Sequence, residues 1–554
     1  MFNRKNKQMK SDRRRMFFIG ILCLFAFSLV AQIQPRKNAG QPVKSKVYLL
    51  HSDVLKKSKK NPNPDAQILV GDVVFRHDSI YMYCDSACFY EKTNSLEAFD
   101  NVKMVQGDTL FLYGDYLFYD GNTQIAQVRN NVRMENRTIT LTTDSLNYDR
   151  LENLGYYFNG GTLMDESNVL TSDWGEYSPA TKISTFNYEV KLVNPKFTLT
   201  SDTLRYHTTT KIATIVGPSD IESDANHIYS EQGIYNTQLG QAELLHRSVL
   251  SNDGKTMTGD SLFYDRNRGI GEAFGDIVFL DTINKNKLTG EYCFYNQLTS
   301  YAFATDKAVA TDFSQGDSLF IHADTLQMFT YHLNTDSVYR EARAFHKVRI
   351  FRTDIQGVCD SLVFSSKDSC LTMYRDPILW NKQQQLLGEE IRVYMNDSTI
   401  DWAHIHNQAL TVERIDSVNF NQVTGQDMKA FFKDGDMRQV DVIGSVRLVY
   451  YPMEKDSTLM GMNVLETGQL KLFLQNRKWK KIWMPKANGT LYPMSQLPPD
   501  QMKLENFAWF DYIRPRNKQD IFNWRGKKAG QELKKSTRGP ISLPNQKLFE
   551  KNKN

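Results

Sequence analysis

Apolar and mixed residues alternate with a period of two along most of the chain. In the stretch "TGDSLFYDRNRGIGEAFGDIVFLD", which begins at Thr258, the apolar residues Leu262 and Tyr264 are separated by one residue. Such alternation is typical of half-buried strands, in which successive side chains point to opposite faces. Polar turn segments such as "YDRNRG" and "FSSKDS" end the strands, and helical periodicity is missing. The pattern therefore predicts an all-β fold.

The pattern recurs at a nearly fixed period, and an acidic residue marks its register. An aliphatic residue usually follows two places after this mark and an aromatic one four places after it. The spacing is most regular from Asp115 to Asp260, and a degenerate twelfth copy starts at Thr424. The marks are Asp85, Asp115, Asp144, Asp173, Asp202, Glu231, Asp260, Glu291, Asp324, Asp360 and Glu389.

Self-similarity at a fixed period indicates a stack of identical structural units. We expect about twelve strand-pair repeats of about 29 residues over residues 67–475. A closed β-helix and an open, V-shaped β-jellyroll are both compatible with this pattern. The first would have a filled core, and the second would have an apolar trough.

Two copies carry a recognisable motif, "MTGDSLFYDRNRGIGEAFGDIVFLD" and "LYGDYLFYDGNTQIAQVRNNVRME". Their G-D-x-L-x-Y pattern, followed by a small residue and a G/N-x-V-x-hydrophobic strand, resembles the repeat of the LptA/OstA family of lipopolysaccharide-transport proteins. The resemblance covers residues 67–450 approximately, as in larger OstA-like proteins that carry a C-terminal extension. It implies an open β-jellyroll that holds lipid A acyl chains, and partner jellyroll proteins in complexes of the inner and outer membranes.

The repeated aliphatic and aromatic positions are the candidate lipid-binding residues. Burial of an acyl chain is worth about 0.8 kcal/mol per CH₂, so an apolar trough can hold a lipid without polar chemistry. The alternative is that these side chains are simply core. The candidates are Leu117, Tyr119, Leu146, Tyr148, Leu204, Tyr206, Leu262, Tyr264 and Leu326.

The N-terminus predicts an export signal in residues 1–31. A basic stretch precedes the apolar residues 16–31, which are shorter than the roughly 20 residues of a spanning helix. An uncleaved N-terminal anchor is the alternative, and a linker is expected over residues 32–66. The signal contributes +6 to the formal net charge of +5, so the remainder carries 5 − 6 = −1. We therefore expect a periplasmic protein that binds no nucleic acid.

Side chains capable of chemistry are scattered. The acidic marks supply one carboxylate per copy, which is poor coordination for Ca²⁺, so a structural corner is favoured. The "HIH" at residues 404–406 places two imidazoles on one strand face, but it has no recognisable third ligand. Cys84 and Cys88 lie about 13 Å apart along a strand, beyond disulfide reach. We expect no enzyme, no metal and no cofactor.

Residues 476–526 are rich in tryptophan and depart from the repeat. Trp479, Trp483, Trp509 and Trp524 lie beside basic residues, which suits a membrane interface or a protein-docking surface. A cap over the open end of the sheet is the favoured alternative, and a disordered basic tail is expected over residues 527–554. A second functional interpretation of the whole chain is a carbohydrate-active or adhesive extracytoplasmic β-helix protein.

Overall fold

The computed structural model describes residues 45–57, 65–223, 226–314, 316–396, 399–454, 456, 458–476 and 478–528. These residues form forty β-strands and three short 3₁₀ helices, with no α-helix among them. The all-β prediction is confirmed. The predicted export signal and residues 529–554 of the predicted tail lie outside the described residues.

The chain divides into two compact units. Unit 1 comprises Met1–Asp108 and Asp115–Gln127, and unit 2 comprises Thr109–Gly114 and Val128–Asn554. The strands of unit 1 are β1 (Tyr48–His51), β2 (Val54–Lys56), β3 (Gln67–His77), β4 (Ile80–Tyr90) and β5 (Ser95–Gln106). Two strands, β6 (Leu110–Asp120) and β7 (Ile125–Asn136), are divided between the units. Because β1 and β2 pair with β3, part of the expected linker is strand.

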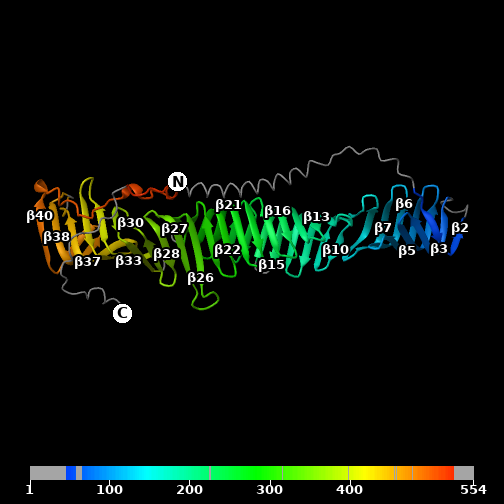
Figure 1. Ribbon diagram of the computed structural model, residues 1–554, viewed down its shortest axis with the longest axis horizontal. Helices are drawn as coiled ribbons and strands as arrows, with labels where there is room; N and C mark the ends of the chain where they lie inside the picture. The colour runs from blue at the N-terminus through cyan, green and yellow to red at the C-terminus, as the bar shows by residue number, and fades with distance from the viewer. Residues whose placement is uncertain are drawn as a thin grey trace, which may run out of the picture. The chain divides into compact units, whose positions relative to one another are not determined.

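Unit 2 is built from antiparallel strands joined by short turns, and Figure 1 shows β13, β15, β16, β21 and β22 following one another along the array. Eleven strands are long: β8 (Ile139–Asp149), β13 (Ile183–Asn194), β14 (Phe197–His207), β15 (Ile212–Ser223), β16 (Asn226–Asn236), β21 (Ile270–Asp281), β22 (Asn286–Asn296), β27 (Tyr339–Phe351), β28 (Ile355–Ser365), β37 (Asp436–Tyr450) and β38 (Gly461–Gln475). The antiparallel pairing excludes the β-helix, whose coils pair in parallel.

The remaining strands of unit 2 are consecutive pairs of shorter strands. They are β9 (Leu154–Tyr157) and β10 (Gly161–Asp165), β11 (Asn168–Ser172) and β12 (Trp174–Ser178), β17 (Gln241–Leu245) and β18 (Val249–Asn252), β19 (Lys255–Thr258) and β20 (Ser261–Asp265), β23 (Tyr301–Thr305) and β24 (Val309–Asp312), β25 (Leu319–His322) and β26 (Thr325–Tyr331), β29 (Cys370–Tyr374) and β30 (Ile378–Asn381), β31 (Gln384–Leu387) and β32 (Glu390–Asn396), β33 (Thr399–His406) and β34 (Ala409–Arg414), β35 (Phe420–Gly425) and β36 (Asp427–Lys433), and β39 (Lys478–Trp483) and β40 (Ala487–Pro493).

The acidic register marks lie where the sheet bends. The register between β13 and β14 shifts between Asn187 and Val190, because Tyr188 and Glu189 both have positive φ (64° and 50°). The backbone amide of Asp173, the bend residue between β11 and β12, donates a 3.1 Å hydrogen bond to the carbonyl of Tyr188. The acidic mark therefore lies at a bend in the middle of a run of strand residues, not at its beginning. The structural corner is this bend.

Each run of strand residues is thus divided by the bend into two halves. The halves on the two sides of the bend form two limbs of the sheet, which meet at the corner. The tyrosine limb includes the pairing of Ile183–Asn187 with residues 203–207, and the strap limb includes residues 190–194 paired with residues 197–201. Side chains that face the space between the limbs form the core, as Phe186, Leu204 and Leu199 do. Alternate side chains point outward, as the period of two predicts.

A segment after β40, residues 497–528, runs back over the outer face of the strap limb, and we call it the strap (Figure 1). Gln422 and Gln385 hold it in place: their amides donate to the carbonyls of Met502 and Ala508 at 2.9 and 2.8 Å. An apolar cluster lies beneath the strap. Its buried members are Val358, Ile378, Trp380, Leu387, Leu410, Val412, Phe420, Phe510 and Ile513.

The tryptophan-rich segment therefore holds two different structures. Residues 478–493 add β39 and β40, both paired with β38, to the sheet. The strap then covers the side of the array, whereas the favoured expectation was a cap over its end. Its 3₁₀ helices are η2 (Asp511–Ile513) and η3 (Asp520–Phe522), and η1 (Met494–Gln496) precedes it.

Candidate functional site

The sequence-predicted apolar ladder lies between the limbs. In unit 2 the structure places Leu146, Tyr148, Leu204, Tyr206, Leu262, Tyr264 and Leu326 on the inner face of the tyrosine limb, and in unit 1 Leu117 and Tyr119 are also buried. These side chains are 0–7% exposed. Their inward orientation follows the alternation seen in the sequence. Their nearly complete burial means that a ligand reaches them only when neighbouring groups move.

Polar side chains join the two limb tips at the mouth of this interior. The hydroxyl of Tyr206, on the tyrosine limb, donates a 2.7 Å hydrogen bond to Asp165 at the tip of the strap limb. Lys211 places its Nζ 2.6 Å from the other oxygen of the same carboxylate, which is fully buried. Burial and the neighbouring carboxylate raise the pKa of Tyr206, so it remains a neutral donor. We call such contacts mouth bridges.

A mouth bridge of the same form lies one repeat earlier. Tyr177 donates to Asn136 at 3.1 Å, and Lys182 donates to the same amide oxygen at 2.8 Å. Farther along, the amide of Asn226 donates to the hydroxyl of Tyr264 at 3.3 Å. The repeat contains this signal, because each polar partner precedes its tyrosine by 41 residues in the first two bridges. Sequence reasoning missed these partners.

The interior is more accessible between β21 and β28. The inward side chains Phe279, Leu288 and Ile321 are half-buried there, and Met328 is 37% exposed. A small cavity of about 30 Å³ lies beside Tyr264. At the repeated aromatic position, Met328 offers no hydroxyl for a mouth bridge. The apolar interior is therefore reachable from solvent in these strands.

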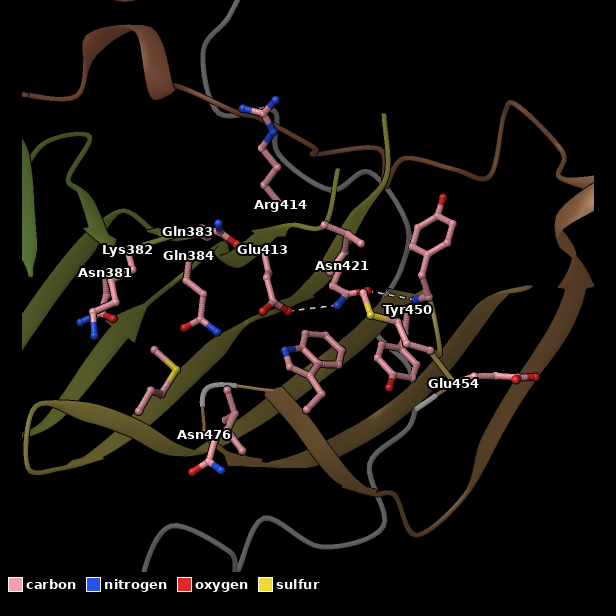
Figure 2. A pocket seen from close by; sticks show the side chains of 16 residues that line it. Asn381, Lys382, Gln383, Gln384, Glu413, Arg414, Asn421, Tyr450, Glu454 and Asn476 are labelled. Carbon is pink, nitrogen blue, oxygen red and sulfur yellow. Dashed lines mark hydrogen bonds between the residues drawn. The ribbon is translucent and has the colours of Figure 1, made fainter. Parts of the chain in front are cut away.

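A larger cavity of about 630 Å³ lies between the limb tips near the end of the array (Figure 2). The rings of Tyr450 and Trp479, which both line it, stack on each other with centroids 4.9 Å apart and nearly parallel planes. Glu413 accepts a 3.0 Å hydrogen bond from Asn421, and burial raises the pKa of this carboxyl. The cavity combines an aromatic wall with amide side chains and with the ionisable side chains of Lys382, Arg414 and Glu454. The residues that line it include no histidine or cysteine, and the side chain of Glu454 points away from Glu413 (Figure 2), so the convergent groups expected of a hydrolytic centre are missing among them.

The four predicted docking tryptophans occupy different surroundings. Trp479 lines the cavity, and Trp509 packs on Phe420 with ring centroids 5.5 Å apart. Trp483 and Trp524 are exposed, and Arg349 lies over the ring of Trp524. The structure does not bring the four together into one surface, and their docking role stays a prediction.

The described cysteines are unpaired. They are Cys84, Cys88, Cys293, Cys359 and Cys370. Burial raises the pKa of the Cys293 thiol to about 12, so it remains protonated at neutral pH. Among the described residues, no helix has the length and apolar character needed to cross a membrane.

Known proteins similar to this chain are found among protein families and among solved structures. The OstA-like protein family model matches residues 44–202 and 219–314. Among solved structures, the chain is similar to LptH from Pseudomonas aeruginosa, the LptA homologous periplasmic component of a lipopolysaccharide transport device. The identity is 19%, the match covers 20% of this chain and 82% of LptH, and the TM-score is 0.19. No curated protein matches the chain.

The family match extends across both units and ends at residue 314, before β25. Strands β25 to β40 lie beyond it and keep the antiparallel pairing of the matched strands, including register shifts in β27 and β37. Through residues 44–202 and 219–314, a little under half of its length, the chain is similar to the OstA-like protein family.

Proposed function

We propose that the protein is a non-enzymatic lipid carrier that conducts lipopolysaccharide towards the outer membrane, with the acyl chains held between its two limbs. The apolar interior of unit 2 carries this proposal, because inward aliphatic and aromatic side chains follow one another from strand to strand. The similarity of residues 44–202 and 219–314 to the OstA-like protein family supports the choice of lipid.

Lipid access requires the limb tips to part. In the strands that hold Tyr177 and Tyr206, mouth bridges oppose this opening. Near Met328 the interior is already accessible, so an acyl chain would enter there first and then displace the bridges. Each methylene moved from water to the interior contributes about 0.8 kcal/mol, so a chain of twelve or more carbons offsets the loss of several hydrogen bonds of about 1 kcal/mol each.

The protein would act outside the cytoplasm, in the periplasm, after export by residues 1–31 or while tethered by them. Its partners would be other jellyroll transport proteins, which would supply the energy and extend the trough. β40 suits such assembly, because six of its seven residues are exposed and an exposed edge strand offers unpaired backbone groups.

Mass spectrometry of lipids that copurify with the full protein from a lipopolysaccharide-producing host tests this function. We expect multiply acylated lipid with the wild type and a marked loss with Met328→Lys, which places a charge at the accessible interior. The control Leu298→Lys changes an exposed turn residue and should retain the lipid. Wild-type protein free of acylated lipid would contradict the proposal.

A carbohydrate-binding role is the second candidate, although the β-helix architecture that accompanied it is excluded. The cavity beside Trp479 favours it, since an aromatic ring next to Glu413 and Asn421 can bind a sugar. Binding to a glycan panel by the lipid-free protein, lost in Trp479→Ala, would support this role over lipid transport.

A further inference from the structure

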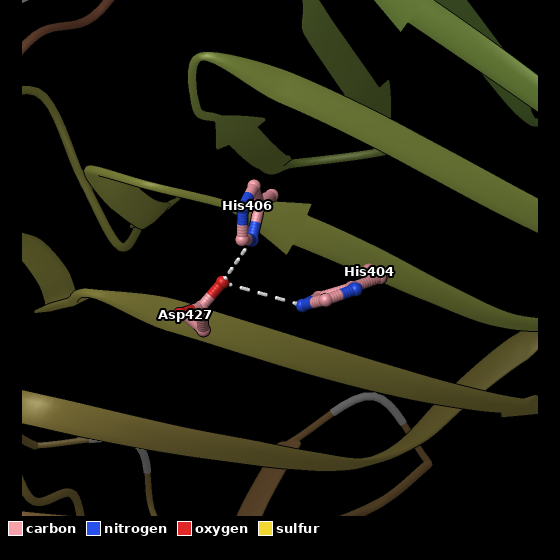
Figure 3. Close-up of side chains that lie close together, drawn as sticks. All are labelled: His404, His406 and Asp427. Atoms are coloured by element: carbon pink, nitrogen blue, oxygen red, sulfur yellow. Dashed lines mark hydrogen bonds and ion pairs between the residues drawn. The ribbon is translucent and has the colours of Figure 1, made fainter.

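Three potential metal ligands meet on the outer face of the tyrosine limb (Figure 3). His404 and His406 lie two residues apart on β33, so both imidazoles point to the same side of the strand. Asp427 lies at the start of the neighbouring β36. Its Oδ1 is 3.3 Å from Nε2 of His404 and 2.5 Å from Nδ1 of His406.

A one-residue shift of the repeat brings the carboxylate to this position. In the twelfth copy the corner is occupied by Gln426. Its backbone N–H donates to the carbonyls of Ile443 and Gly444 at 2.9 Å each. The acidic residue follows one place later. Since successive side chains alternate between faces, this shift moves the carboxylate from the corner onto the outer sheet face beside the two imidazoles. The sequence alone left the "HIH" motif without this third ligand.

The geometry suits a small divalent ion. One ligand atom from each residue can be chosen so that all lie within 4.8 Å of one another. A tetrahedral ion with bonds of about 2.0–2.1 Å separates its ligands by about 3.3 Å, so modest outward movement of His406 suffices. Imidazole nitrogens with one carboxylate favour zinc and its first-row neighbours over Ca²⁺ or Mg²⁺, which prefer oxygen ligands.

Neighbouring side chains limit the movement of the ligand side chains. Trp402 lies beside His404 and stacks on Tyr394 with ring centroids 4.1 Å apart, which limits the movement of the His404 ring. Opposite His406, Glu390 forms a 2.6 Å ion pair with Arg392. Lys429 on β36 pairs with His404 across the two strands, and its ammonium lies over the Trp402 ring, 5.3 Å from the ring centre.

We propose that His404, His406 and Asp427 form a binding site for a divalent first-row transition ion, best suited to Zn²⁺. The bound ion would link β33 to β36 through side chains and leave one coordination position open to water or to a ligand atom from a partner. This site is separate from the interior, so it does not depend on lipid transport.

Isothermal titration of the full, metal-free protein with ZnCl₂ tests the site. We expect one high-affinity site per chain, and affinity at least about tenfold weaker in each of His404→Ala, His406→Ala and Asp427→Asn because each removes a ligand. The matched control is His227→Ala. His227 forms a 2.8 Å pair with Asp220 at similar exposure, outside the three-ligand cluster, and its loss should leave the affinity unchanged.

Thermal unfolding and Co²⁺ absorption provide independent measurements. Zn²⁺ should raise the Tm of the wild type and of His227→Ala, but not that of the three ligand variants. Co²⁺ in the wild type should show the intense visible bands of a four-coordinate complex. This measurement needs no variant, so it tests the site even where a variant fails to fold. Equal Zn²⁺ affinity in the wild type and the ligand variants, or weak octahedral Co²⁺ bands, would overturn the proposal.

Discussion

At the scale of single residues, the mouth bridges are polar contacts placed where water is excluded. Asp165 is fully buried, and its two oxygens are met by Tyr206 and Lys211. A buried carboxylate is tolerated when charge and hydrogen bonds compensate its desolvation. Removal of one donor therefore costs more than an average surface hydrogen bond.

Tyr206→Phe should destabilise the protein by about 1.5–3 kcal/mol, since it deletes a hydrogen bond to a charged, buried group. Urea unfolding at fixed pH measures this change. Tyr188→Phe is the control, because Tyr188 is 62% exposed and its change should stay within about 0.5 kcal/mol. Equal effects of the two substitutions would show that the Tyr206 bridge contributes nothing.

Glu413 should make stability depend on pH. Burial raises its folded-state pKa above that of the unfolded chain, so the folded protein retains a proton that the unfolded chain releases. Stability therefore falls as pH rises from the unfolded pKa, about 4.3, through the folded pKa. As the pH rises between these two pKa values, Glu413→Gln should become progressively more stable than the wild type. Denaturant unfolding at several pH values measures this difference. A stability difference that is constant with pH would contradict this.

The inward residues were predicted from the sequence, whereas their polar partners were missed. The period of two placed Leu204 and Tyr206 on the same face without any structural knowledge. Asp165 precedes Tyr206 by 41 residues, and their contact depends on how two limbs fold at the corner. Asp427 escaped notice for the same reason, because its contact with His404 is set by strand pairing.

At the scale of single elements, the corners depend on left-handed backbone positions. At the corner of Asp260, Gly275 has a φ of 70° and its carbonyl accepts the amide of Asp260 at 2.9 Å. A side chain at Gly275 would meet the carboxylate of Asp260 and would also adopt an unfavourable φ.

Gly275→Ala should therefore destabilise the protein by about 1–2 kcal/mol. Chemical denaturation provides the measurement. Gly316→Ala serves as a comparison, because an added methyl group there meets nothing within 4 Å and the φ is not positive. If both substitutions have the same effect, the corner does not require the left-handed conformation.

The strap is an element that the sequence did not disclose. Gln385 is fully buried because its side chain contacts both Ala508 and Phe510, more than a hundred residues away. A glutamine within a strand carries no signal of such a distant contact, and tryptophans beside basic residues suggested an end cap or a docking surface instead. The position of the strap is instead set by its packing against the outer face of the strap limb.

Phe510→Ala should loosen the strap, since truncation of a buried phenylalanine costs about 3–5 kcal/mol and Phe510 is the largest fully buried side chain of the strap. Limited proteolysis should then cleave within residues 497–528 at low protease concentration, while the strands remain intact. Phe522→Ala removes an exposed ring and should leave cleavage unchanged. Resistance of Phe510→Ala to the protease would mean that the remaining contacts of the strap, such as Ile513 and Ile521, hold it without this ring.

At the scale of the whole molecule, the repeated inward side chains form the apolar interior. The fixed period of the acidic marks predicted the stacked array, and antiparallel pairing then excluded the β-helix. The sequence could not reveal how far the limbs close, because closure depends on contacts between limb tips. In unit 2, the closed mouth near Tyr206 and the accessible interior near Met328 divide the trough into regions with different access.

The central claim is that lipid lies between the limbs, and site-specific photocrosslinking in lipopolysaccharide-producing cells tests it most directly. A photoreactive residue replaces the inward Leu204, Leu262 or Met328, or the outward Arg205 or Phe263 on the same strands as Leu204 and Leu262. We predict lipopolysaccharide adducts at the inward positions, strongest at Met328, and none at the outward ones. Adducts at outward positions alone, or at no position in protein that remains folded, would contradict the account.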